Sequence, residues 1–107
     1  MSETRHFIAR SADGDPSLVT RHVAGETLIV PVSGNMADLE SIFVLNDVGS
    51  HIWARLLRGP ATVDELARAV VAAFDVSADA ATADVAAFLD DLSSRRLVRV
   101  VEESGRP

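Results

Sequence analysis

The sequence contains no cysteine, no lysine and no long apolar run. Without cysteine there is neither a disulfide nor a thiolate site, a composition that fits a reducing cytoplasm. A membrane-spanning helix needs about 20 consecutive apolar residues, and the longest helical run here is only Ala69–Phe74. Met1–His6 also lacks the basic and then apolar order of a signal peptide. These absences predict a cytoplasmic protein with no membrane segment.

The charge of the chain is acidic, since 16 carboxylates outnumber ten basic residues and leave a net charge of −6. Nucleic acids and anionic membranes attract positive charge, so this balance disfavours both as partners. A cationic peptide or a cationic enzyme surface would be compatible with it. Solubility alone also accounts for such a charge.

Candidate catalytic and metal-binding residues are sparse. His6, His22 and His51 are far apart in the sequence and show no His-x-x-x-His spacing. Ser50 and His51 are adjacent, so on a helix their side chains project in different directions and cannot form a working Ser–His pair. The sequence has neither a Gly-x-Gly-x-x-Gly motif nor a phosphate loop. We therefore expect no enzyme, no bound metal and no cofactor.

The first half of the chain is predicted to be a small sheet. A length of 107 residues suits one domain with its own core. Residues 1–16 are polar and irregular, which predicts a flexible tail. Leu18–Val23, Thr27–Val32 and Asp38–Leu45 are apolar segments joined by short turns, and they predict an antiparallel meander. Asp38–Leu45 has neither proline nor lysine, so its outer edge is predicted to be open to another strand.

The apolar spacing then changes to 3.6 and predicts three helices. Asn46, Thr62 and Ser77 are the predicted N-caps, with Glu65 completing a capping box at Thr62. A short closing strand and a flexible tail over 102–107 follow. The predicted buried stripes are Val48, Ile52, Trp53, Leu56 and Leu57; Leu66, Ala67, Val70, Val71 and Phe74; and Ala81, Val85, Phe88, Leu89 and Leu92; the closing strand is Leu97–Val101. The expected fold is α+β and winged-helix-like, a three-stranded antiparallel sheet followed by three helices.

A winged-helix layout introduces DNA binding as an alternative, with the third helix in the major groove. Such a helix usually offers Arg, Lys, Asn or Gln to bases and phosphates. Here it offers Asp84, Asp90 and Asp91, which would repel phosphates. A DNA-binding or purely structural protein-interaction domain therefore stays the second hypothesis, ahead of an enzyme.

Three motifs occur in order along the helices. They are Leu-Asn-x-x-Gly-x-x-Ile-Trp at Leu45–Trp53, Thr-Val-x-Glu-Leu at Thr62–Leu66 and Asp-Val-x-x-Phe-Leu at Asp84–Leu89. With them, the chain resembles the PqqD-like family of leader-peptide-recognition domains from about Leu18 to Leu97. The resemblance implies a non-catalytic peptide chaperone over 17–101, which binds the leader of a ribosomally made precursor and presents it to a modifying enzyme.

The resemblance also implies where the peptide binds. PqqD-like domains accept a leader as an extra strand beside the third strand, in a cleft walled by the third helix, and helical positions 84, 88, 91 and 95 share one flank. Phe88 is then an apolar anchor, Asp84 and Asp91 meet leader cations or polar groups, and Arg95 meets a leader carboxylate. The other implied contacts are Val85 and Leu92 on the cleft floor and Leu39, Glu40, Ser41, Ile42, Phe43 and Val44 on the strand.

Alternatives stay open for both sides of this cleft. Val85, Phe88 and Leu92 fit an ordinary core equally well, and the strand edge could be covered or paired with itself in a homodimer. Family members that serve pyrroloquinoline quinone synthesis tend to carry Pro-Glu-Gly before the Leu-Asn pair, and Ala37–Val44 has no such segment. The implied partner is therefore an enzyme of another peptide pathway, such as a radical SAM protein or a lasso-type protease and cyclase.

Overall fold

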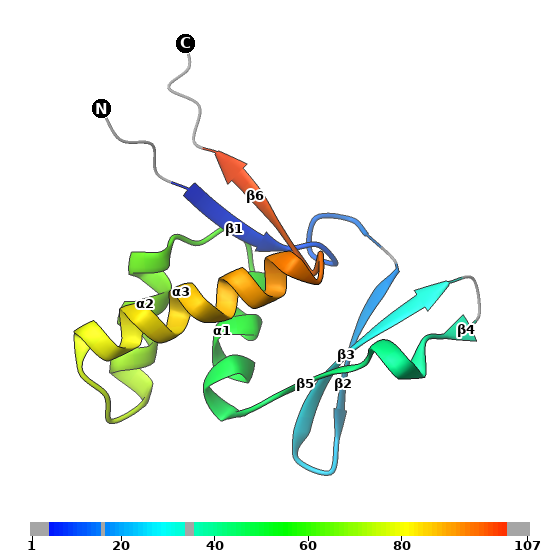
Figure 1. Cartoon of the computed structure of the whole chain (residues 1–107), viewed down its shortest axis with the longest axis horizontal. Helices are drawn as coiled ribbons and strands as arrows, with labels where there is room; N and C mark the ends of the chain where they lie inside the picture. Colours follow the sequence, from blue (N-terminus) through cyan, green and yellow to red (C-terminus); the bar gives the residue numbers. More distant parts are fainter. Residues whose placement is uncertain (1–4, 16, 34–35, 103–107) are drawn as a thin grey trace.

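The computed structural model shows an α+β fold, as the sequence predicted (Figure 1). It describes residues 5–15, 17–33 and 36–102, without the side chains of Ser33, Leu39 and Glu102. The elements in chain order are β1 (Arg5–Ala9), β2 (Leu18–Val23), β3 (Glu26–Ser33), β4 (Met36–Ala37), the 3₁₀ turn η1 (Leu39–Ser41), β5 (Phe43–Leu45), α1 (Asp47–Leu57), α2 (Val63–Ala73), α3 (Ala78–Ser94) and β6 (Val98–Glu102).

The predicted meander is present as the antiparallel order β2-β3-β5. A tight turn joins β2 to β3, and Ala24 and Gly25 both have positive φ there, 53° and 83°, as hairpins with a right-handed twist favour. Ile29 on β3 is fully buried and lies opposite Phe43 on β5. On the other side of β3, Thr20 of β2 lies opposite Ile29, so one face of the sheet supplies the core.

The predicted third strand, Asp38–Leu45, is wrong over its first half. Only Phe43–Leu45 pairs with β3 as β5, while Leu39–Ser41 forms η1 and Met36–Ala37 pairs with the end of β3 as β4. The Asp38 side chain accepts a hydrogen bond from the Glu40 backbone N–H at 3.2 Å. This local bond offers the backbone an alternative to the ladder, and it turns the chain where the sequence suggested extended structure.

The chain also has a second, two-stranded sheet, in which β1 pairs antiparallel with β6. The expectation that residues 1–16 form a flexible tail is therefore wrong for Arg5–Ala9, because Phe7, Ile8 and Ala9 are buried. Phe7 and Ala61 exchange backbone hydrogen bonds of 2.8 and 2.9 Å, which ties β1 to the segment before α2. The predicted closing strand is confirmed as β6, and residues 103–107 of the predicted C-terminal tail lie outside the described residues.

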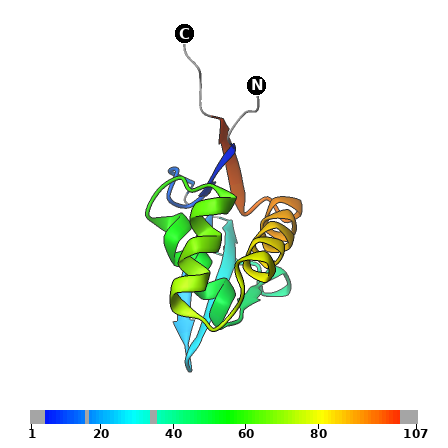
Figure 2. The ribbon, with the colours of Figure 1, turned by 90° about the vertical axis from the view of Figure 1, so that its left-hand side faces the viewer.

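The three helices begin where their caps predict. The Asn46 side chain accepts from Gly49 N at 2.7 Å, Ser77 accepts from Ala80 N at 3.1 Å, and Thr62 forms the predicted capping box with Glu65. Figure 2 shows α3 beside the pair α1 and α2. The largest fully buried side chains from the helices are Ile52, Trp53, Leu56, Leu66, Val70, Val85, Leu89 and Leu92.

One residue of the predicted apolar stripes lies outside the core. Val71 on α2 is 40% exposed, because the helix turns its Leu66, Ala67 and Val70 face inward and leaves Val71 at the margin of that face. None of the described helices is long and apolar enough to cross a membrane.

Candidate functional site

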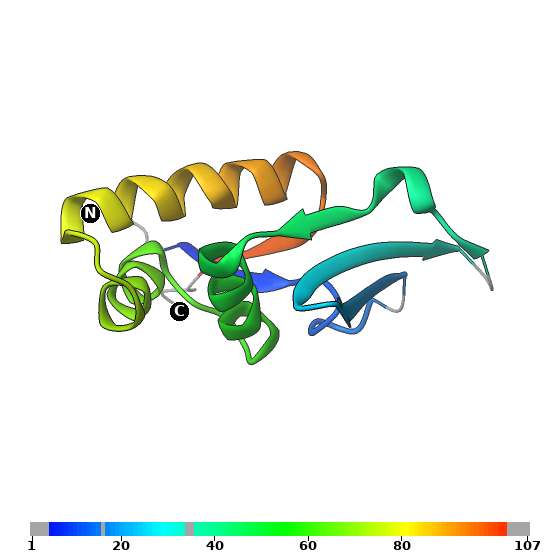
Figure 3. The same ribbon diagram turned by 90° about the horizontal axis from the view of Figure 1, so that it is seen from below.

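The short strand β5 is an edge of its sheet. It pairs with β3 on one side, and none of the strands in the described ranges pairs with its other side. Figure 3 shows β5 between β3 and α3, so the free edge lies close to the last helix. Val44, in the middle of β5, is 52% exposed. Unpaired N–H and C=O groups in such a position can accept another strand.

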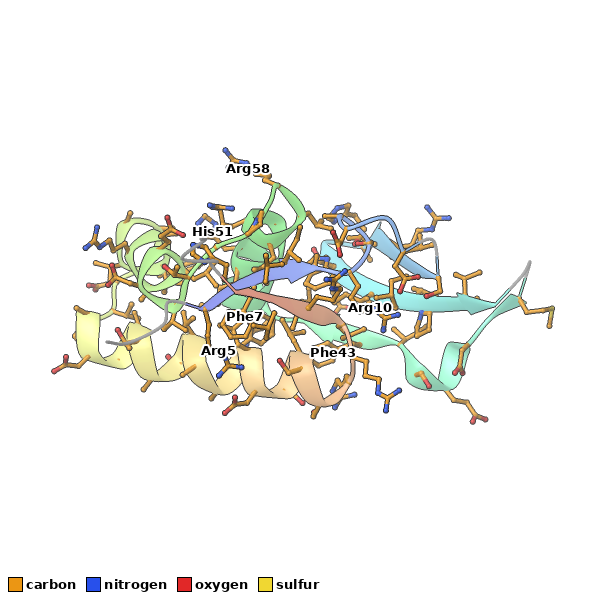
Figure 4. The ribbon with its side chains drawn as sticks, turned by 90° about the horizontal axis from the view of Figure 1, so that it is seen from above. Arg5, Phe7, Arg10, Phe43, His51 and Arg58 are labelled. Atoms are coloured by element: carbon orange, nitrogen blue, oxygen red, sulfur yellow. The ribbon has the colours of Figure 1, made fainter. Side chains whose placement is uncertain are left out.

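An aromatic pair joins β5 to α3. The rings of Phe43 and Phe88 are stacked with their centroids 6.3 Å apart and their planes 25° apart. The Arg95 guanidinium carbon lies 4.5 Å from the centre of the Phe43 ring, a cation–π geometry. Arg95 Nε also donates to the Asp91 carboxylate at 3.1 Å. Figure 4 shows Phe43 beside the C-terminal part of α3, so the structure brings together four of the residues predicted for the site.

Two hollows lie along this junction, and we call them the Asp84 hollow and the Arg95 hollow. Each has a volume of about 290 Å³. Phe88 belongs to the first and Phe43 to the second, so the aromatic pair separates them. We call the two hollows and the pair together the groove. The Asp84 hollow is lined by Asn46, Val48, Gly49, Ile52, Asp84 and Phe88, and the Arg95 hollow by Pro31, Glu40, Ser41, Phe43, Arg95 and Leu97.

Gly49 sets the distance between α1 and the aromatic pair. A Cβ at this position would lie 3.2 Å from two ring carbons of Phe88 and 3.1 Å from the capping oxygen of Asn46. Both distances are tighter than ordinary van der Waals contact. Glycine therefore allows the close approach of α1 and α3 that gives the Asp84 hollow its wall.

The carboxylates in and beside the groove differ in their surroundings. Asp91 is held by Arg95 in an ion pair whose side chains are 46% and 51% exposed. Asp84 is exposed and makes no ion pair or side-chain hydrogen bond with any residue in the described ranges. Glu40 is also exposed, at the rim of the Arg95 hollow. The predicted role of Arg95 toward a leader carboxylate stays a prediction, and it would require a change of partner.

Not every predicted site residue reaches the groove. Val85 and Leu92 are both 0% exposed, so the expectation that they form a floor open to a peptide is wrong: they are core residues behind the wall. Val44 faces the opposite side of the sheet from Phe43 because strand side chains alternate. Ile42 is partly buried and lines neither hollow, and the side chain of Leu39 lies outside the described part of the structure.

Sequence reasoning missed six of the residues that line the groove. Four of them, on α1 and its cap, carry a signal that could have found them, because they lie in or beside the Leu-Asn-x-x-Gly-x-x-Ile-Trp motif. The other two are joined to the site only by the fold. The missed residues are Asn46, Val48, Gly49 and Ile52, then Pro31 and Leu97.

The described residues offer little for catalysis or metal binding. They contain no group of three or more His, Cys, Asp or Glu side chains placed to hold a metal ion. The His51 ring packs edge-on against Phe74, with centroids 5.6 Å apart and planes at 89°. His51 is therefore turned toward the end of α2, away from the groove.

Comparison with known proteins gives two matches and one negative result. A family model described as coenzyme PQQ synthesis protein D (PqqD) matches residues 35–98, a stretch that holds β5, all three helices and most of the groove. A solved structure, TbiB1 in complex with the TbiA(beta) leader peptide, is similar with a TM-score of 0.64 and 25% sequence identity. The similarity covers 79% of this chain and 92% of that chain. None of the curated proteins matches.

Proposed function

This chain belongs to the PqqD family, and from that premise we propose that it is a non-catalytic protein that binds the leader of a ribosomally made precursor peptide. The observation that carries the proposal is the free edge of β5 beside the groove. The similar protein TbiB1 was solved with a leader peptide bound, which supports the same class of ligand here.

Strand addition is the proposed mode of binding. A guest strand beside β5 would extend the order β2-β3-β5 by one strand and satisfy the free main-chain groups of Phe43–Leu45. Its side chains would alternate, so that one set enters the two hollows and the other lies next to exposed Val44. Affinity would then come from the backbone, and specificity from the hollows.

The proposed binding surface on the protein combines both elements. Phe88 would be an apolar contact because its ring is only partly buried and reaches the surface between the hollows. Asp84, Asp91 and Arg95 would contact polar groups of the leader from α3. A protein that only holds a leader needs an enzyme to act on the rest of the precursor, and we propose a radical SAM protein or a lasso-type protease and cyclase as that partner.

Titration of the ¹⁵N-labelled protein with synthetic leader peptides tests the proposal. Leaders would be taken from short precursor genes found beside a maturation enzyme. We expect amide shifts to concentrate at Phe43–Leu45 and along 84–95. Shifts that spread evenly over the surface, or that concentrate on another face, would contradict the proposal.

N-methylated peptides separate strand addition from other modes of binding. One analogue is methylated on the backbone nitrogens that would face β5, and its matched control on the alternate nitrogens. The first should lose binding because it lacks the donors for the ladder, whereas the second should keep most of it. Equal affinity of the two analogues would rule out a guest strand. Duplex DNA at low salt should produce no shifts, because the exposed face of α3 is acidic.

A further inference from the structure

The proposed function leaves open which chemistry the groove selects. Resting on that function, we propose that the bound segment carries a basic side chain in the Asp84 hollow, two residues away from an apolar side chain that packs on Phe88. Three features of the groove support this: the unpaired carboxylate, the balance of charge around it, and the spacing between Asp84 and Phe88.

Asp84 is the only charged residue among the six that line its hollow. It has no ionic partner within the described part of the chain, whereas Asp91, further along the same flank, is already paired with Arg95. The remaining lining is apolar apart from Asn46, whose side-chain oxygen is engaged by Gly49 N. A long basic side chain could place its methylene groups against partly buried Val48 and its cation at the carboxylate.

The helix dipole of α1 opposes a cation here but does not decide the sign. The N-terminus of a helix is equivalent to about half a positive charge, and the first turn of α1 lines the hollow. Asp47 lies in that same turn and carries a full negative charge. With Asp84 included, the charge around the hollow is negative, so it favours a basic group over an acidic one.

The Arg95 hollow does not reverse this preference. The Arg95 guanidinium contacts both the Asp91 carboxylate and the face of the Phe43 ring, and the acidic residue Glu40 also lines the Arg95 hollow. The lining of the groove therefore has two carboxylates, Asp84 and Glu40, and one guanidinium, which is already paired with Asp91. A leader carboxylate would have to compete with groups of the same charge for Arg95.

The spacing follows from helix and strand geometry. Asp84 and Phe88 are four residues apart on α3, which is a rise of about 6 Å. Two residues of an extended strand span about 6.6 Å and point their side chains to the same side. A guest strand that runs along α3 therefore matches Asp84 and Phe88 with positions i and i+2, or i and i−2 if it runs the other way.

Selection of peptides from a random library tests the inference without knowledge of the natural leader. A display library of random 12-residue peptides is selected in parallel on the wild-type protein, Asp84→Asn and Asp90→Asn. Asp90→Asn is the matched control, because it removes the same charge from an exposed position of the same helix but lines neither hollow. Wild type and Asp90→Asn should enrich Lys or Arg two residues from an apolar residue, and Asp84→Asn should not.

A titration then measures the size of the effect. The best peptide from the wild-type selection is compared with an analogue in which norleucine, an uncharged residue with the four side-chain carbons of lysine but no ammonium group, replaces the basic residue. Replacement should weaken binding about fivefold for wild type and Asp90→Asn, the range of a partly exposed ion pair, and leave Asp84→Asn unchanged.

The outcomes separate the inference from the proposed function. Peptides that shift the amides of β5 and α3 but show no basic preference, or keep it on Asp84→Asn, would overturn the inference and leave leader binding intact. Peptides that bind away from the groove, or the recovery of none on any variant, would count against strand addition at β5 and so against both.

Discussion

At the scale of single residues, position 49 decides the shape of the groove. Glycine inside a helix costs about 1 kcal/mol relative to alanine, so a helix alone would not select it. A Cβ at this position would lie 3.2 Å from the ring of Phe88, closer than ordinary van der Waals contact, so the ring would have to move by a few tenths of an ångström. The same ring lines the Asp84 hollow and stacks on Phe43. A side chain at position 49 would therefore change the proposed ligand-binding surface as well as the packing of α1.

Gly49→Ala should therefore change the site more than the stability. The gain in helix propensity and the pressure on Phe88 act in opposite directions, so the free energy of unfolding should change by no more than about 1 kcal/mol. The ring resonances of Phe88 and Phe43 should shift in NMR spectra, and leader affinity should fall. Ser50→Ala, one position along the helix, is the control. Unchanged ring resonances in Gly49→Ala would refute this account.

The sole tryptophan makes a hydrogen bond between a helix and a strand. Trp53 is 1% exposed, and its indole N–H donates to the Thr20 hydroxyl at 2.9 Å, which links α1 to β2. Thr20→Val keeps the shape but removes the acceptor, so it should destabilise the protein by about 1–3 kcal/mol in urea unfolding. Thr82→Val, at an exposed helical site, should cost less than about 0.5 kcal/mol. Equal costs for the two variants would show that the indole bond contributes little.

At the scale of elements, β5 is an open edge that is kept short. It has three residues, and the side chains of Asp38 and Asn46 cap the η1 turn before it and the helix after it. Short edge strands are one way in which proteins limit unwanted pairing. A homodimer formed through β5 stays an alternative use of this edge.

The capping box of α2 makes the stability of the protein depend on pH. Hydrogen bonding from the Thr62 backbone N–H, against a smaller opposing effect of desolvation, holds the pKa of Glu65 below its ordinary value of 4.5. The folded state therefore favours the charged form. The contribution of the charged Glu65 side chain to the free energy of unfolding is complete above the pKa that Glu65 has in the unfolded chain. This contribution is lost as the pH falls through the lower pKa of Glu65 in the folded state.

Glu65→Gln isolates that contribution, because the amide oxygen can still accept the bond but cannot titrate. The unfolding free energy of the wild type should fall more steeply than that of the variant as the pH is lowered from about 5 to about 3. Other carboxylates, including Asp15, titrate in both proteins and cancel in the comparison. Parallel pH profiles would mean that the capping box makes no pH-dependent contribution.

At the scale of the whole molecule, the paired strands β1 and β6 close the fold. The pairing buries Phe7, Ile8 and Ala9, and Val98 of β6 is 7% exposed. The Arg10 guanidinium donates to the carbonyl of Arg96, just after the end of α3. Since α3 is a wall of the groove, the N-terminal strand helps to fix that wall from outside the region matched by the family model.

Deletion of residues 1–9 should therefore lower stability far more than deletion of residues 1–4. The longer deletion removes three buried side chains and leaves β6 without its partner, so it should cost at least about 3 kcal/mol. Thermal unfolding followed by circular dichroism measures the difference. Similar midpoints for the two deletions would show that β1 is dispensable. Phe7→Ala tests the same contact if the longer deletion does not fold.

Features whose causes lie within a few residues could be predicted from the sequence. Caps at Asn46, Thr62 and Ser77 and the apolar spacing between them define the helices, because each signal depends on neighbouring side chains and backbone groups. The motifs around these caps also identified the family, and the flank of α3 that carries Phe88 was placed correctly beside the strand edge.

Features that join distant segments could not be predicted in this way, because they depend on how the whole chain folds. The pairing of β1 with β6 links residues more than 80 positions apart, and neither strand carries a local sign of the other. The choice between core and cleft floor for Val85 and Leu92, the exposure of Val71 and the two hollows likewise depend on which elements meet. A side chain's pattern shows that it can be buried, but the neighbours that bury it are set by packing across the whole chain.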